Sequence, residues 1–156
     1  MSLAQQCVGE LAATREFFNR STRNLTEELS GYAPAAGSMT TAQQVAHAAR
    51  VIDWFMEGAF RPEGFAMDFE EQIKLVLAVD SLAAARTWFA NSVEAAVAFL
   101  ASQSDAGLSA ALPEGPVMGG LPRFDIMAAI TDHTAHHRGA LAVYARLNGV
   151  KPPDPY

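Results

Sequence analysis

Two histidines one helical turn apart, His133 and His137, have the residue type and spacing best suited to chemistry in this sequence. They lie in the stretch Ile126–Tyr144, where apolar residues recur at helical spacing and share one face with both imidazoles. Imidazoles at positions i and i+4 of a helix can bind one metal ion, whereas unpartnered imidazoles are costly to bury. Thr134 follows His133, so the Glu that serves zinc proteases as a general base is absent from this motif.

A metal site that keeps a position open for a small molecule needs a third protein ligand. The histidine outside this stretch is His47, and it too lies on a segment with helical spacing. His136 points roughly 60–100° away from the face of the pair, so we expect it to be partly exposed. Asp132 lies on the same flank, either as an acceptor for a ligand histidine or as a solvated carboxylate.

The residues therefore predict a metal site formed by His47, His133 and His137. The alternative is that these histidines are core residues that hydrogen-bond to backbone or water. Imidazole ligands suit zinc, nickel and copper, so the spacing does not select one metal.

Four long segments with apolar residues at helical spacing must position these histidines. Four aromatic residues on them are candidates for both the core and a pocket wall: Trp54, Trp88, Phe89 and Tyr144. The predicted helices run from Leu3 to about Leu29, from Thr40 or Thr41 to about Glu57, from Ser81 after an Asp80 cap to about Gln103, and from Pro122 to Asn148.

The connections between these helices indicate how the bundle is wired. The segment Gly58–Val79 is expected to be a long crossover with a short helical turn, which would leave the second and third helices parallel. The other connections are rich in Gly and Pro, and Leu108–Val117 is expected to form a short hairpin. An all-α four-helix bundle is the natural packing of four amphipathic helices, as a single domain over residues 1–156.

Composition excludes several classes of function. Half of the 156 residues are apolar and 18% are charged, as in a folded globular protein. The net charge of −6 has the wrong sign for a nucleic-acid binder. Neither a signal peptide nor a membrane-spanning stretch of about 20 apolar residues is visible. The single Cys7 permits a reducing compartment, and we expect a soluble, cytoplasmic protein with no nucleic-acid or membrane partner.

A histidine early in the second helix, followed on the last helix by His133-Thr-Ala-His-His137-Arg-Gly139, resembles the DinB/YfiT-like family. The closing segment Leu147–Tyr156 is also similar to the usual ending of those chains. The resemblance covers essentially the full length and implies an up-down-down-up four-helix bundle. It also implies a divalent metal, commonly zinc or nickel, held by the histidines at 47, 133 and 137. The family motif commonly continues with Gln, where this chain has Ala140.

The same resemblance implies an activity. Characterised relatives include thiol S-transferases that use low-molecular-weight thiols such as bacillithiol, and a mycothiol-dependent maleylpyruvate isomerase. The expected function is therefore that of a metal-dependent, thiol-dependent S-transferase acting on small electrophiles, with a low-molecular-weight thiol as cosubstrate. A metal-dependent hydrolase and a non-catalytic metal-binding bundle are the alternatives. A homodimer is plausible on the same resemblance.

Overall fold

The computed structural model describes residues 1–155, in which every regular element is helical. Four long helices dominate, and shorter helices lie in the connections between them. The prediction of an all-α protein is confirmed. The long helices are α1 (Leu3–Thr22), α2 (Thr41–Phe60), α4 (Leu82–Ala101) and α6 (Ile126–Leu147); the short ones are α3 (Phe69–Leu77), α5 (Asp105–Ser109) and the 3-10 helices η1 (Glu27–Leu29) and η2 (Arg123–Asp125).

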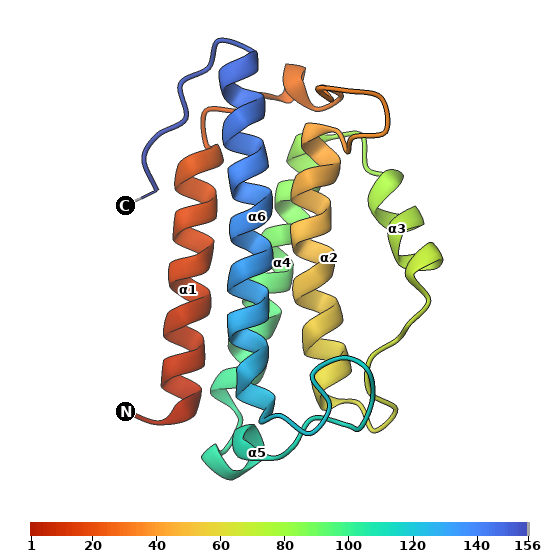
Figure 1. Cartoon of the computed structure of the whole chain (residues 1–156). Coiled ribbons are helices and arrows are strands. Elements are labelled where there is room, and N and C mark those ends of the chain that lie inside the picture. The colour runs from red at the N-terminus through yellow and green to blue at the C-terminus, as the bar shows by residue number, and fades with distance from the viewer. Residues whose placement is uncertain (156) are drawn as a thin grey trace.

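The four long helices form an up-down-down-up bundle (Figure 1). In Figure 1, α1 and α6 run upward while α2 and α4 run downward. Each long helix packs against two others, in the ring order α1, α6, α2, α4. The parallel pair α2 and α4 is joined by a crossover that runs back along the bundle and contains α3, so the predicted wiring is confirmed.

Side-chain caps fix where the long helices begin. Thr40 accepts a hydrogen bond from the backbone of Gln43, whose side chain in turn accepts from the Thr40 backbone N–H. This capping box satisfies two backbone donors that α2 would otherwise leave unpaired. On α4 the cap is Ser81 rather than the predicted Asp80, and its side chain accepts from the backbone of Ala84.

The first helix ends at Thr22, seven residues before the predicted end at Leu29. Arg86 of α4 donates from Nη2 to the carbonyl oxygens of Thr22 at 2.7 Å and Leu25 at 3.1 Å. Carbonyl groups at the end of a helix need such partners, and a guanidinium supplies them without further helical turns. The prediction of one continuous helix was wrong because its terminating partner lies on another helix.

The predicted hairpin over Leu108–Val117 is also wrong. Its first residues belong to α5, where Ser104 caps the helix by accepting from the backbone of Gly107 at 3.1 Å. Leu108 is fully buried, which anchors this helical turn to the core. The sole pairing of strand type among residues 1–155 is an isolated bridge between Ala111 and Pro122.

The core lies between the long helices and is mostly apolar, with some buried polar side chains such as Thr14, Ser92 and Thr134. Phe18 of α1 stacks on Phe89 of α4 with ring centroids 4.4 Å apart, and both side chains are at most 2% exposed. None of the helices within residues 1–155 combines the length and the apolarity needed to cross a bilayer. Other fully buried side chains include Leu11, Val45, Ile52, Leu82, Leu100, Ile126, Ile130 and Leu141.

Candidate metal site

The three predicted ligands meet in the middle of the seam between α2 and α6. His47 comes from α2, and His133 and His137 come from successive turns of α6. One ring nitrogen from each lies within 4.8 Å of those from the other two. The ring centroids are 5.1 Å apart for His47 and His133, 4.8 Å for His47 and His137, and 4.7 Å for His133 and His137.

These separations fit a single ion. The Nε2 atoms of His133 and His137 are 2.9 Å apart. Nitrogen atoms bound to one tetrahedral zinc ion, with bonds of about 2.0–2.1 Å, lie about 3.4 Å apart. The 2.9 Å separation and the 4.8 Å upper limit for the cluster lie on either side of that value. The Nδ1 atom of His47 is buried and has no hydrogen-bond partner among residues 1–155, which is a further sign that this cluster suits a metal.

Gln44 fixes the orientation and the tautomer of His137. The Tyr144 hydroxyl donates to the carbonyl oxygen of Met39 at 3.0 Å, so it accepts from Nε2 of Gln44 at 3.1 Å. That choice turns Oε1 of Gln44 toward Nδ1 of His137, 2.5 Å away, and this nitrogen must carry the proton. The lone pair of His137 Nε2 is thereby directed into the cluster, as hydrogen bonds to metal-bound histidines commonly arrange.

The sequence pattern predicted Gln44 only as a possible capping-box partner of Thr41, and not as a residue of the metal site. It lies one turn before His47 on α2, so both side chains project from similar faces. Its place on the helical row that continues through His47 to Val51 and Trp54 is the sequence signal that could have identified it. Its partner on α6 is 93 residues away in the chain, however, and only the fold brings the two together.

All three imidazoles are held neutral. Burial, followed by the nearby His133 and His47, lowers the pKa of His137 to about 3. Burial, with His47 next in importance, lowers the pKa of His133 to about 4. The pKa of His47 is lowered too, first by burial and then by His136. Neutral imidazoles keep a lone pair free for a metal, so proton competition at neutral pH is weak.

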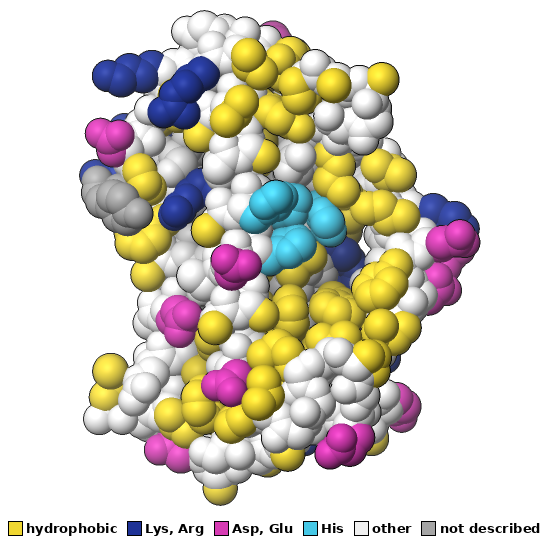
Figure 2. All heavy atoms as spheres, in the orientation of Figure 1, with side chains coloured by type: hydrophobic (Ala, Val, Ile, Leu, Met, Phe, Trp, Pro, Cys, Tyr) yellow, Lys and Arg dark blue, Asp and Glu magenta, His cyan; other side chains and the backbone are white. Residues whose placement is uncertain are grey.

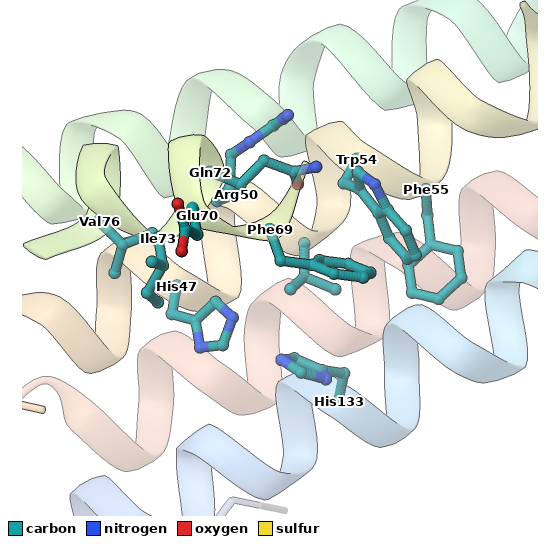
Figure 3. A pocket seen from close by; sticks show the side chains of 11 residues that line it. His47, Arg50, Trp54, Phe55, Phe69, Glu70, Gln72, Ile73, Val76 and His133 are labelled. Atoms are coloured by element: carbon teal, nitrogen blue, oxygen red, sulfur yellow. The ribbon is translucent and has the colours of Figure 1, made fainter. Parts of the chain in front are cut away.

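A cavity of about 530 Å³ opens beside the cluster, between α2 and α3. Figure 3 shows the rings of His47 and His133 on one side of it, with aromatic side chains around the remaining space. Trp54 is held in the wall by a 2.7 Å hydrogen bond from Nε1 to the carbonyl of Ala66. The lining residues are His47, Arg50, Val51, Trp54, Phe55, Phe69, Glu70, Gln72, Ile73, Val76 and His133.

The remaining candidates lie outside the cluster. His136 is exposed, as predicted, and is not part of the convergent group. Asp132 is exposed and, among residues 1–155, makes no hydrogen bond to a histidine, so Gln44 fills the role considered for it. Ala140 is partly exposed. Of the four aromatic candidates, Trp54 lines the cavity, Phe89 is core, and Trp88 instead donates to Asp53 at 2.7 Å.

Two solved structures are similar to this chain over nearly its whole length. A DinB-like protein from Bacillus subtilis is 20% identical, with 95% of each chain covered and a TM-score of 0.62. A DinB-like protein from Bacillus cereus is 21% identical, with 99% of this chain and 95% of that chain covered and a TM-score of 0.65. At such identities the likeness establishes a shared fold. A comparison with curated proteins gave no match.

A family model also matches this chain, and this match establishes more than a shared fold. The model of the DinB superfamily matches residues 10–141, a span that includes α2, most of α6 and all three clustered histidines. The chain therefore belongs to the DinB superfamily.

Proposed function

We propose that this protein is a divalent-metal-dependent enzyme, specifically a thiol-dependent S-transferase acting on small electrophiles, with His47, His133 and His137 as its metal ligands. The observation that supports this best is the convergence of three neutral imidazoles beside a cavity of about 530 Å³. That volume falls within the range of small-molecule sites. Zinc or nickel is what the resemblance to the DinB/YfiT-like family implies, and imidazole ligands suit both.

A divalent ion bound by three neutral imidazoles supplies a Lewis acid with an open position, which lowers the pKa of a thiol or water that reaches it. The chain itself does the positioning. Gln44 holds His137 with Nε2 facing the cluster, and the depressed pKa values keep the ligand nitrogens unprotonated. Trp54, Phe55 and Phe69 form an apolar wall of the cavity beside the site.

The transfer proposed here joins the sulfur of a low-molecular-weight thiol to an electrophilic carbon. The thiol gives up its proton to solvent, the new S–C bond forms, and the leaving group departs with the electron pair of the bond it breaks. The choice of a thiol rests on the resemblance to thiol-using relatives, and Ala140 marks a position where those relatives commonly carry a polar Gln.

Two alternatives share the same residues. A hydrolase would use water in place of the thiol, and turnover without any thiol would favour it. A non-catalytic metal-binding bundle would close the site with a fourth protein ligand. The partly exposed His133 and the adjoining cavity favour an open site.

Elemental analysis of protein purified without a histidine tag tests the site directly. We expect about one equivalent of transition metal, lost in each of His47→Ala, His133→Ala and His137→Ala and retained in His136→Ala. A parent protein that takes up neither zinc nor nickel, even after reconstitution, would overturn the metal proposal. A screen of the metal-loaded protein with several thiols and electrophiles then tests the transfer, and silence across the screen would count against it.

The proposal also concerns the organisation of the whole chain. We propose that the whole chain acts as one domain, because the two helices that supply the histidines also pack on α1 and α4. A cytoplasmic location, a homodimer and the lack of a nucleic-acid partner stay predictions.

A further inference from the structure

One buried charge lies in the cavity and takes no part in the histidine cluster. Arg50 follows His47 by three residues on α2 and lines the same cavity. Its side chain is 13% exposed. Figure 2 shows basic surface inside the hollow beside the histidines, and Arg50 is the basic residue among those lining the cavity. A guanidinium placed so deep in a mostly apolar wall needs a reason.

The hydrogen-bonding groups of Arg50 are only partly used. Its Nη2 atom is 3.3 Å from Oε2 of Glu57, whose side chain is 47% exposed. Its Nε atom is buried and has no hydrogen-bond partner among residues 1–155. The N–H groups on Nε and Nη2 lie in the guanidinium plane and point in the same direction along one edge, which binds a carboxylate through two parallel hydrogen bonds. Half of this edge is unpartnered.

The rest of the cavity wall suits an apolar molecule. Trp54, Phe55 and Phe69 gather at one end, with their rings in mutual contact through Trp54. The polar Gln72 already donates from Nε2 to the carbonyl of Ala66 at 3.0 Å. Glu70 lies at the cavity but is exposed. Arg50 is therefore the buried charge available to a ligand that enters this space.

We propose that the cavity binds an apolar substrate carrying a carboxylate, which pairs with Nε and Nη2 of Arg50 while the apolar body packs against Trp54 and Phe69. His47 and Arg50 line the same cavity, so one small molecule that fills it lies against both residues. Its carboxylate displaces Glu57 from Nη2 into solvent. The reactive group of the substrate then lies toward the histidine cluster. This inference rests on the proposed function for the reaction, but not for the binding.

Binding of phenylacetate and of phenylacetamide to the zinc-loaded full-length protein tests the inference, by titration calorimetry and by the fluorescence of Trp54. The two probes differ in charge and share an apolar body. We expect phenylacetate to bind at least about tenfold more tightly, as a charge-assisted, bidentate hydrogen bond implies. Arg50→Gln should remove this preference, Arg50→Lys should restore part of it, and the exposed Arg146→Gln should leave it unchanged.

Glu57→Gln provides a test of opposite sign. Because Glu57 competes for Nη2, its neutral variant should bind phenylacetate about threefold more tightly and phenylacetamide as before. Equal affinity for the two probes, or a preference that survives Arg50→Gln, would overturn the inference. Mercaptoacetate separates the source of the carboxylate: if it depends on Arg50 and phenylacetate does not, the carboxylate belongs to the thiol and the assignment to the apolar substrate is wrong.

Metal content measured in every variant keeps the two proposals apart. Arg50→Gln and Glu57→Gln should keep about one equivalent of zinc, so a lost preference cannot be ascribed to a lost metal. Phenylacetate binding that depends on Arg50 in protein unable to hold metal would leave the carboxylate site standing and remove the metal-dependent function. Circular dichroism of each variant checks that the bundle is folded.

Discussion

Opposite sides of the same bundle are built on opposite principles. On the α1–α4 side, Phe18 and Phe89 stack face to face and exclude water. On the α2–α6 side, three imidazoles and an amide occupy the space, and two of the imidazoles are partly exposed. The first arrangement gains free energy of folding from apolar burial. The second must satisfy each polar group individually, and within residues 1–155 it leaves Nδ1 of His47 without a partner.

The difference shows how a small bundle separates stability from chemistry. Because the ring order is α1, α6, α2, α4, the α1–α4 and α2–α6 seams lie across the bundle from one another. Polar groups in the second seam therefore do not interrupt the aromatic packing in the first. Variants in the two seams should accordingly fail in different ways, one by unfolding and the other by losing the metal.

The largest effect on stability is expected at the α1–α4 seam, where Phe18 and Phe89 stack. Phe89→Ala removes a buried ring stacked on Phe18 and should lower the free energy of unfolding by about 3–5 kcal/mol. Urea denaturation in the presence of a chelator measures this change. The folded fraction should still bind about one equivalent of zinc. A loss below about 1 kcal/mol, or a loss of zinc from folded protein, would contradict the separation of the two seams.

Gln44→Ala changes the α2–α6 seam and should lower the affinity for metal. The variant frees His137 to rotate and to change tautomer, so zinc affinity should fall by about 10–100-fold. Competition with a chromogenic chelator gives the affinity. Gln44→Glu, which still accepts from Nδ1 of His137, should retain most of it, and Gln103→Ala on the surface serves as the control. Equal affinity in Gln44→Ala and the parent would refute the role of the amide.

The α2–α6 seam should also make the metal-free protein sensitive to acid. In the unfolded chain the histidines titrate near a pKa of about 6.5, whereas His133 and His137 in the folded protein have pKa values of about 4 and about 3. Between these values the unfolded chain binds more protons, so stability falls as pH drops from about 6.5 toward 4 and is fully retained above that range. Urea unfolding at pH 7 and pH 5 in chelator measures this fall.

Replacement of one titrating group provides the control for this pH effect. His133→Gln keeps a polar side chain that does not titrate, so its stability should change less between the two pH values than that of the parent. An unchanged pH dependence in His133→Gln would show that the acid sensitivity arises elsewhere in the chain.

The smallest effect is expected at His136. This residue neighbours His137 in sequence but is exposed and lies outside the convergent group. His136→Ala should leave zinc content unchanged and zinc affinity within about twofold of the parent, as for most surface substitutions. A loss of metal in this variant would mean that the metal ligands include His136.

The helical spacing of apolar residues and the helix-capping residues supported most of the correct predictions. The start of α2, the parallel arrangement of α2 and α4, and the grouping of His47 with the α6 pair all follow from local patterns and from one long connection. Such features can be predicted because the face of a helix and the length of a loop depend on residues that are close together in the sequence. The last helix was expected directly after Pro122, whereas Arg123–Asp125 forms the 3-10 helix η2 and α6 begins at Ile126.

The features that sequence reasoning missed depend on contacts between distant segments. The end of α1 is set by Arg86, 64 residues beyond Thr22, and the orientation of His137 by an amide on another helix. Local propensity favoured a longer helix and gave Gln44 no role in the metal site. The helix α3 was expected only as a short turn, and its packing on α2 is what turns the crossover into a wall.

The crossover between α2 and α4, which contains α3, determines where substitutions can alter the cavity. Up-down-up-down wiring would join α2 to α4 with a tight turn, and the cavity beside His47 would have no α3 to close it. Here the wiring itself supplies a wall that stands outside the four-helix frame. Substitutions on Phe69–Leu77 can reshape the ligand space while Phe18, Phe89 and the histidine cluster stay intact. The exposed positions of α3 can therefore change the shape of the cavity at little risk to folding, whereas Val76 is fully buried in the core.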